Sequence, residues 1–117
     1  MNDDGDAALL LDMILAARDA LSFLEGLDEA AFMASRLHQN AMIRSLEVIG
    51  EAAGKVSSNL RAKNPEIPWR EITGMRHRLA HNYRDVQLEI VWFAVTENLA
   101  PLIAMLEPLI GYEGKDG

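Results

Sequence analysis

The chain has 117 residues, of which 50% are hydrophobic and 25% are charged, and it carries a net charge of −7 and no cysteine. This length and balance predict one globular domain over residues 1–117 with a core of its own. The lack of cysteine excludes a disulfide scaffold and thiolate metal sites, and the acidic balance argues against a long, sequence-independent nucleic-acid groove.

The N-terminus, Met1–Asp6, is acidic, whereas a secretion signal carries positive charge there. The first apolar run, at 7–11, is too short to span a bilayer. These features predict a cytoplasmic protein with no membrane partner.

Apolar residues recur at spacings of three and four over much of the chain, as is typical of helices. Asp6 is the predicted N-cap of a first helix that runs to about Glu25. The segment Glu29–Val56 contains no proline, so it fits one long helix or two helices joined near 38–40. Gly50 would weaken such a helix by about 1 kcal/mol relative to alanine, and the close approach of a neighbouring helix would explain its presence.

The segment Ser57–Pro68 is predicted to be the main irregular part, because a residue before proline is pushed towards extended backbone. Pro68 can be the first residue of a shorter helix that carries Trp69 through about His81, since proline is well tolerated at the first helical position. Asn82 is the expected stop, because asparagine tolerates the left-handed conformation that ends many helices.

Asp85 is predicted to cap a last helix over 87–110. Pro101 should distort this helix near Glu97, because its ring removes a hydrogen bond and clashes one turn back. Residues 111–117 are expected to form a frayed tail.

The sequence shows no alternating strand pattern, so the predicted fold class is all-α: a four-helix-type bundle with short extra helices, dimeric through helix packing. The helices carry more apolar surface than a monomer of this length easily hides. Three methionines on these faces could belong to the core or to a dimer interface, and the sequence leaves this open: Met33, Met42 and Met105.

The densest group of reactive side chains is Met75-Arg76-His77-Arg78-Leu79-Ala80-His81-Asn82-Tyr83. Cleaving RNA without a metal requires a group that moves a proton near neutral pH and a fixed cation that stabilises charge on phosphorus. His81 suits the first task, because imidazole has a pKa of about 6.5. Arg76 suits the second, because guanidinium matches phosphate oxygens and stays charged.

Geometry limits how these two side chains can cooperate. On a regular α-helix, five residues leave two positions about 140° apart around the axis. Arg76 and His81 therefore converge only if the helix ends or loosens between them, or if two subunits share the site.

The segment resembles the Arg-x4-His-x-Tyr signature of the HEPN superfamily (higher eukaryotes and prokaryotes nucleotide-binding domain), and most of all its branch of HepT-like toxins. Two flanking segments are similar as well: Leu46-Glu47-Val48-Ile49-Gly50-Glu51-Ala52-Ala53 and Ile67-Pro68-Trp69-Arg70-Glu71-Ile72. The resemblance extends from the first helix to about Leu109.

This resemblance implies an all-helical homodimer in which two motif copies meet in a cleft between subunits. It implies a metal-independent endoribonuclease that needs no cofactor, acts on RNA as the toxin of a toxin–antitoxin pair, and uses Arg76 and His81 as catalytic residues. His77 is taken to support the site, and Arg78 and Asn82 are placed with it. Two basic segments facing one cleft could hold RNA on an otherwise acidic protein.

Tyr83 is the position that, by the same resemblance, a cognate minimal nucleotidyltransferase antitoxin modifies with AMP. The added AMP would place negative charge and bulk where the RNA phosphate must lie, so it would block RNA binding.

Three alternatives stay open from the sequence. His77, His81 and Asp85 are spaced like a metal-binding ridge, but they extend over two turns, too far to converge on one ion, and no fourth ligand is evident. The basic segment could be a helix end that neutralises a helix dipole and pairs with Glu66, Glu71 or Glu89. Finally, the same cleft could belong to a catalytically inactive module that binds a nucleotide or a partner protein.

Overall fold

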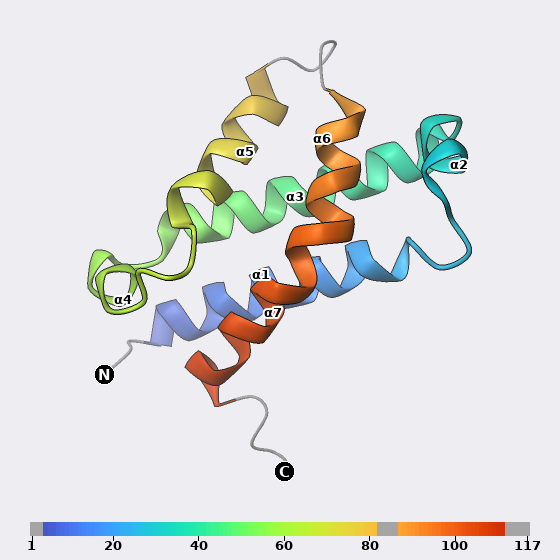
Figure 1. Cartoon of the computed structure of the whole chain (residues 1–117). Coiled ribbons are helices and arrows are strands. Elements are labelled where there is room, and N and C mark those ends of the chain that lie inside the picture. Colours follow the sequence, from blue (N-terminus) through green and yellow to red (C-terminus); the bar gives the residue numbers. More distant parts are fainter. Residues whose placement is uncertain (1–3, 82–86, 112–117) are drawn as a thin grey trace.

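The computed structural model of the chain describes residues 4–81 and 87–111, and within these ranges every regular element is a helix (Figure 1). The predicted all-α class is therefore confirmed. Two long helices, α1 (Asp4–Ser22) and α3 (Arg36–Lys55), pack against each other along their length. In Figure 1 the helix α5 (Trp69–His81) and the last helical run (Leu88–Ile110) cross in front of this pair.

The core lies between these two layers. The apolar rows predicted from helical spacing supply its centre, and Leu10, Ile14, Met42 and Ile49 are fully or almost fully buried. Met42 therefore belongs to the core, and it is not available to a dimer interface.

Asp6 is not the N-cap of α1, because α1 begins at Asp4. The Asp6 residue is only 3% exposed, and its carboxylate accepts hydrogen bonds from the backbone N–H of Ser57 at 2.9 Å and from the Ser57 hydroxyl at 2.6 Å. Ser57 is itself the N-cap of α4 (Ser58–Lys63) and accepts from the N–H of Leu60. Asp6 thus connects the first turn of α1 to the start of α4.

The segment 29–56 forms two helices, α2 (Glu29–Met33) and α3, and they separate earlier than the position predicted near 38–40. Ser35 causes the break by capping α3: its hydroxyl accepts from the N–H of His38 and lies 2.7 Å from the His38 Nδ1. His38 is therefore part of a helix cap.

The prediction of an irregular segment over 57–68 is wrong in its first half, where α4 forms. Two interactions explain this helix: the Ser57 cap and the burial of Leu60 in the core. The following loop is closed by the Trp69 indole N–H, which donates to the carbonyl of Asn64 at 3.0 Å. α5 then begins at Trp69, one residue after the predicted first position, Pro68.

The last helical run comprises α6 (Leu88–Phe93), a π-helical turn (Ala94–Asn98), α7 (Leu99–Leu106) and a 3-10 turn (Glu107–Ile110). The distortion predicted near Glu97 is confirmed, and it takes the form of the π turn. Pro101 accounts for it, because proline has no N–H to bond one turn back and π turns absorb such local mismatches. The N-cap of α6 is Gln87, while the predicted cap Asp85 and the predicted tail after Gly111 lie outside the described residues.

The run Leu88–Ile110 is long and apolar enough to cross a membrane by length and composition, and 28% of its most apolar window is buried. A core helix of a soluble protein passes the same test. Here Val91, Val95, Leu102 and Leu106 lie in the core, and Arg18 of α1 forms an ion pair with Glu107. Cellular location and the lack of a membrane partner stay predictions. The exposed part of this run is mixed, since it holds Phe93 at 59% exposure beside the polar Glu97 and Asn98.

We expect Asp6→Ala to lower the free energy of unfolding by about 1–3 kcal/mol, because the Ser57 N–H and hydroxyl lose their buried acceptor. Urea denaturation followed by circular dichroism measures the change. Asp12→Ala, at an exposed position of the same helix, is the matched control and should change stability little. Equal effects of the two substitutions would show that the Asp6–Ser57 contact does not stabilise the fold.

Candidate active site

The candidate site lies on α5, which is held against α3 at Gly50. A Cβ at position 50 would lie 2.4 Å from the Cβ of Arg76 and 3.1 Å from the carbonyl oxygen of Ile72, and Cβ contacts under 3.0 Å essentially never occur. Only glycine therefore lets the two helices come this close. The close approach predicted for Gly50 is confirmed, and the neighbouring helix is the one that carries the motif.

Arg76 starts at this helix–helix contact but is exposed, so its stem leads from the α3 surface to solvent. Arg78 is exposed as well. Within the described part of the chain, neither arginine forms an ion pair or side-chain hydrogen bond, and Glu66 and Glu71 do not pair with them. The guanidinium groups are therefore available to a ligand, and the alternative of a helix end paired with these glutamates finds no support in these contacts.

α5 continues as an α-helix through His81, so the helix neither ends nor loosens between Arg76 and His81. Their backbone positions therefore stay about 140° apart around the axis. The side chains of His77 and His81 are outside the described structure, and so are Asn82, Tyr83 and Asp85. Their predicted roles, the metal ridge included, are thus not tested by this geometry.

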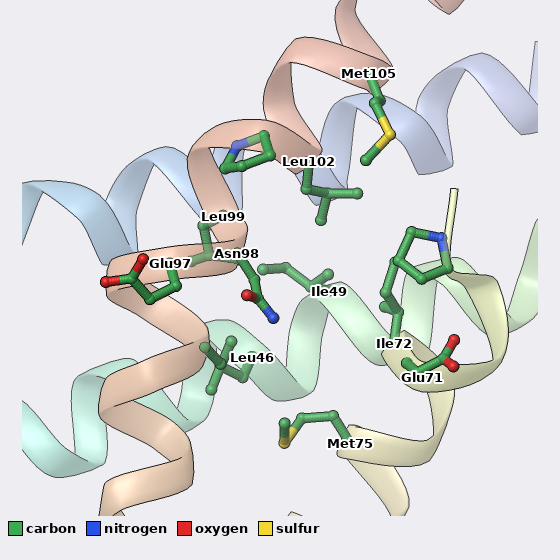
Figure 2. Close-up of a pocket in the computed structure, with 13 residues that line it drawn as sticks. Leu46, Ile49, Glu71, Ile72, Met75, Glu97, Asn98, Leu99, Leu102 and Met105 are labelled. Carbon is green, nitrogen blue, oxygen red and sulfur yellow. The ribbon is translucent and has the colours of Figure 1, made fainter. Parts of the chain in front are cut away.

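An open, mostly apolar cavity of about 330 Å³ lies beside α5 (Figure 2). α3, α5 and α7 each contribute to its lining: Leu46, Ile49, Ile72, Met75, Leu102 and Met105. The π turn adds Glu97 and Asn98, and Figure 2 shows Glu97 and Glu71 on opposite sides of the cavity. Such a lining suits apolar side chains of a protein better than RNA phosphates.

The sequence did not locate this cavity, because its walls come from helices far apart in the chain. Two signals pointed towards it: the excess of apolar surface over what a monomer hides, and Met105, which is half-buried in the cavity wall.

Comparison with known proteins identifies the family. The model of the family described as Ribonuclease HepT-like matches residues 13–109, which include α3, α5 and the motif. The chain belongs to the Ribonuclease HepT-like family. This confirms the resemblance drawn from the sequence and, with it, the enzyme class of the family, ribonuclease.

Several curated relatives support this assignment. A protein of Thermococcus cleftensis named as a probable ribonuclease HepT is 38% identical over 78 residues, which are 67% of this chain and 71% of the relative. Two proteins of Methanocaldococcus jannaschii, both named as candidate RNases, are 34% identical. One alignment covers 92 residues, 79% of this chain and 84% of the relative, and the other covers 110 residues, 93% and 91%. No solved structure matches the chain.

We expect Gly50→Ala to lower the free energy of unfolding by about 1–3 kcal/mol and to reduce RNA cleavage, because the added methyl group pushes α5 and the Arg76 stem away from α3. Gly54→Ala is the matched control on the same helix. Among the described residues, the Thr73 methyl group is what its Cβ would meet, at an ordinary 3.7 Å. Thermal unfolding and RNA cleavage assays on both variants check the expectation, and equal behaviour of the two would contradict it.

Proposed function

We propose that this protein is the toxin of a cytoplasmic toxin–antitoxin pair, a homodimeric endoribonuclease that cuts RNA without a metal or cofactor. Membership of the ribonuclease family supports the RNA substrate. The proposed arrangement of the site is inferred from the unbroken α5, which places Arg76 and His81 on different sides of one helix. A second copy of the chain is then needed to bring an arginine and a histidine to one phosphate.

The chemistry assigned to these residues follows from RNA itself. The 2′-hydroxyl attacks the adjacent phosphorus, a new P–O bond forms, and the bond to the 5′-oxygen of the next nucleotide breaks. His81 moves the proton, as a base at the attacking hydroxyl or an acid at the leaving oxygen. Arg76 stabilises the additional negative charge on the phosphate oxygens. His77, Arg78 and Asn82 support the site from the same segment.

The surface beside α5 supports pairing of two chains. The apolar cavity is open, Met75 and Met105 are only half-buried in it, and Phe93 on α6 is 59% exposed. Covering such surface removes apolar area from water, which is the usual driving force of a homodimer interface. The second half of α5, which carries the motif, borders this cavity through Met75. An interface here would therefore place both motif copies near each other.

A complementation experiment tests the shared site. Arg76→Ala should lower kcat/KM for RNA cleavage by about 10²–10³, and His81→Ala by about 10²–10⁴. Equal amounts of the two variants, allowed to exchange subunits, should recover about a quarter of the wild-type rate, because half of the dimers are mixed and each mixed dimer keeps one intact site.

Differently tagged subunits allow the mixed dimer to be purified, so a failure to exchange is recognised. A purified mixed dimer as inactive as both parents would show that each site is built within one chain. RNA left intact by the wild-type protein would favour the inactive nucleotide- or protein-binding module.

Control of the toxin is assigned to Tyr83. A minimal nucleotidyltransferase antitoxin would transfer AMP to the Tyr83 hydroxyl, and the added charge would repel the RNA phosphate. Tyr83→Phe should therefore cut RNA at close to the wild-type rate but should no longer be silenced when the partner and ATP are present. Mass spectrometry of the intact protein, which detects the added AMP, is run beside the cleavage assay. If the partner silences Tyr83→Phe as well as wild type, control runs through protein–protein contact.

A further inference from the structure

The outward face of α5 carries a row of three residues, Arg70, Gly74 and Arg78, spaced one helical turn apart. Residues on the opposite side of the helix, Ile72 and Arg76, contact α3 at Gly50. By helical geometry the backbone position of His81 continues the row, because it lies seven residues, or two turns, after Gly74.

The described residues give no reason for a glycine at position 74. Outside its own turn of backbone, a Cβ at this position would meet no atom of the described residues within 4 Å, whereas Gly50 is required by the neighbouring helix. A glycine in the middle of a helix costs stability relative to alanine, so an open glycine here suggests a requirement outside the monomer. Glycine is the residue that lets another molecule approach a backbone most closely.

The two arginines on either side of Gly74 indicate that the approaching molecule carries negative charge. Arg70 and Arg78 are exposed, and neither forms an ion pair or side-chain hydrogen bond with any residue that the structure describes. They lie eight residues apart, or about 12 Å along the helix axis, so they can contact two different phosphates of one strand. Glu71, an acidic neighbour, lines the apolar cavity beside the row (Figure 2).

We propose that Arg70, Gly74 and Arg78 form a track for the phosphodiester backbone of the RNA substrate, which leads from the cleavage site towards the start of α5. The track rests on the proposed function, because it extends the substrate beyond the phosphate held at Arg76 and His81. Arg70 and Arg78 bind phosphates, and Gly74 leaves room for the strand between them. A second copy of the chain fits this face less well, because arginines would meet arginines across a parallel pairing.

The first test compares short and long ligands that cannot be cut. Oligonucleotides of two and eight 2′-O-methyl nucleotides lack the attacking hydroxyl, so binding is measured without cleavage. Arg70→Ala should weaken binding of the eight-nucleotide ligand about tenfold and lower its salt slope by about 0.7. Binding of the dinucleotide should not change. Arg36→Ala, at an exposed arginine at the start of α3, is the matched control and should leave both ligands unaffected.

The second test uses glycine. Gly74→Ala should raise the melting temperature, because alanine favours helix and the added methyl group clashes with none of the described residues, yet it should weaken binding of the eight-nucleotide ligand. Gly54→Ala should not lower the melting temperature and should leave binding unchanged. Sedimentation of both variants reports self-association.

Three outcomes would overturn the track. Equal loss of both ligands in Arg70→Ala would place Arg70 in the cleavage site, and unchanged binding would remove it from the substrate path. If Gly74→Ala keeps its RNA affinity but loses self-association, the row contacts a second copy of the chain. Wild-type protein that binds the long ligand through Arg70 but never cuts RNA would contradict the proposed function and leave the track standing.

Discussion

The contact of Gly50 with Arg76 is the constraint on which the rest of the site depends. A Cβ at position 50 would lie 2.4 Å from the Cβ of Arg76, so the close spacing of α3 and α5 depends on one residue that has no side chain. This contact fixes how α5 is turned against α3: Arg76 packs at Gly50, Ile72 and Met75 line the cavity, and Arg70, Gly74 and Arg78 face outward. A methyl group at position 50 would disturb all three faces at once.

The three faces of α5 have different chemistry, and this separation resolves the conflict between an acidic protein and an RNA substrate. The net charge of −7 belongs to the body of the molecule, whereas the outward face of α5 carries arginines without partners among the described residues. The cavity side is apolar and suits a protein partner. Focused positive charge on one helix is enough for a small phosphate site, although it would not serve a long groove.

The shape of the cavity depends on the last helical run. Pro101 interrupts the regular hydrogen bonds, and the resulting π turn (Ala94–Asn98) places Ala94, Glu97 and Asn98 in the cavity wall. Pro101 itself lines the same cavity, so a single proline shapes this wall both directly and through the π turn. The ion pair of Arg18 with Glu107 and the burial of Leu106 hold the far end of this run against α1.

Local interactions are what the sequence by itself determined. The spacing of apolar residues and the prolines at positions 68 and 101 act within one or two turns of the chain. The helix class, the start of α5 and the distortion near Glu97 were therefore predictable. The motif residues indicated the chemistry. Tertiary structure alone decided the role of Asp6, whose acceptor contacts lie 51 residues away. It also decided the cavity between three helices and the different surroundings of Gly50 and Gly74. The sequence predicted a close helix at Gly50, but only packing identifies that helix as α5 and shows that a Cβ at Gly74 would clash with none of the described residues.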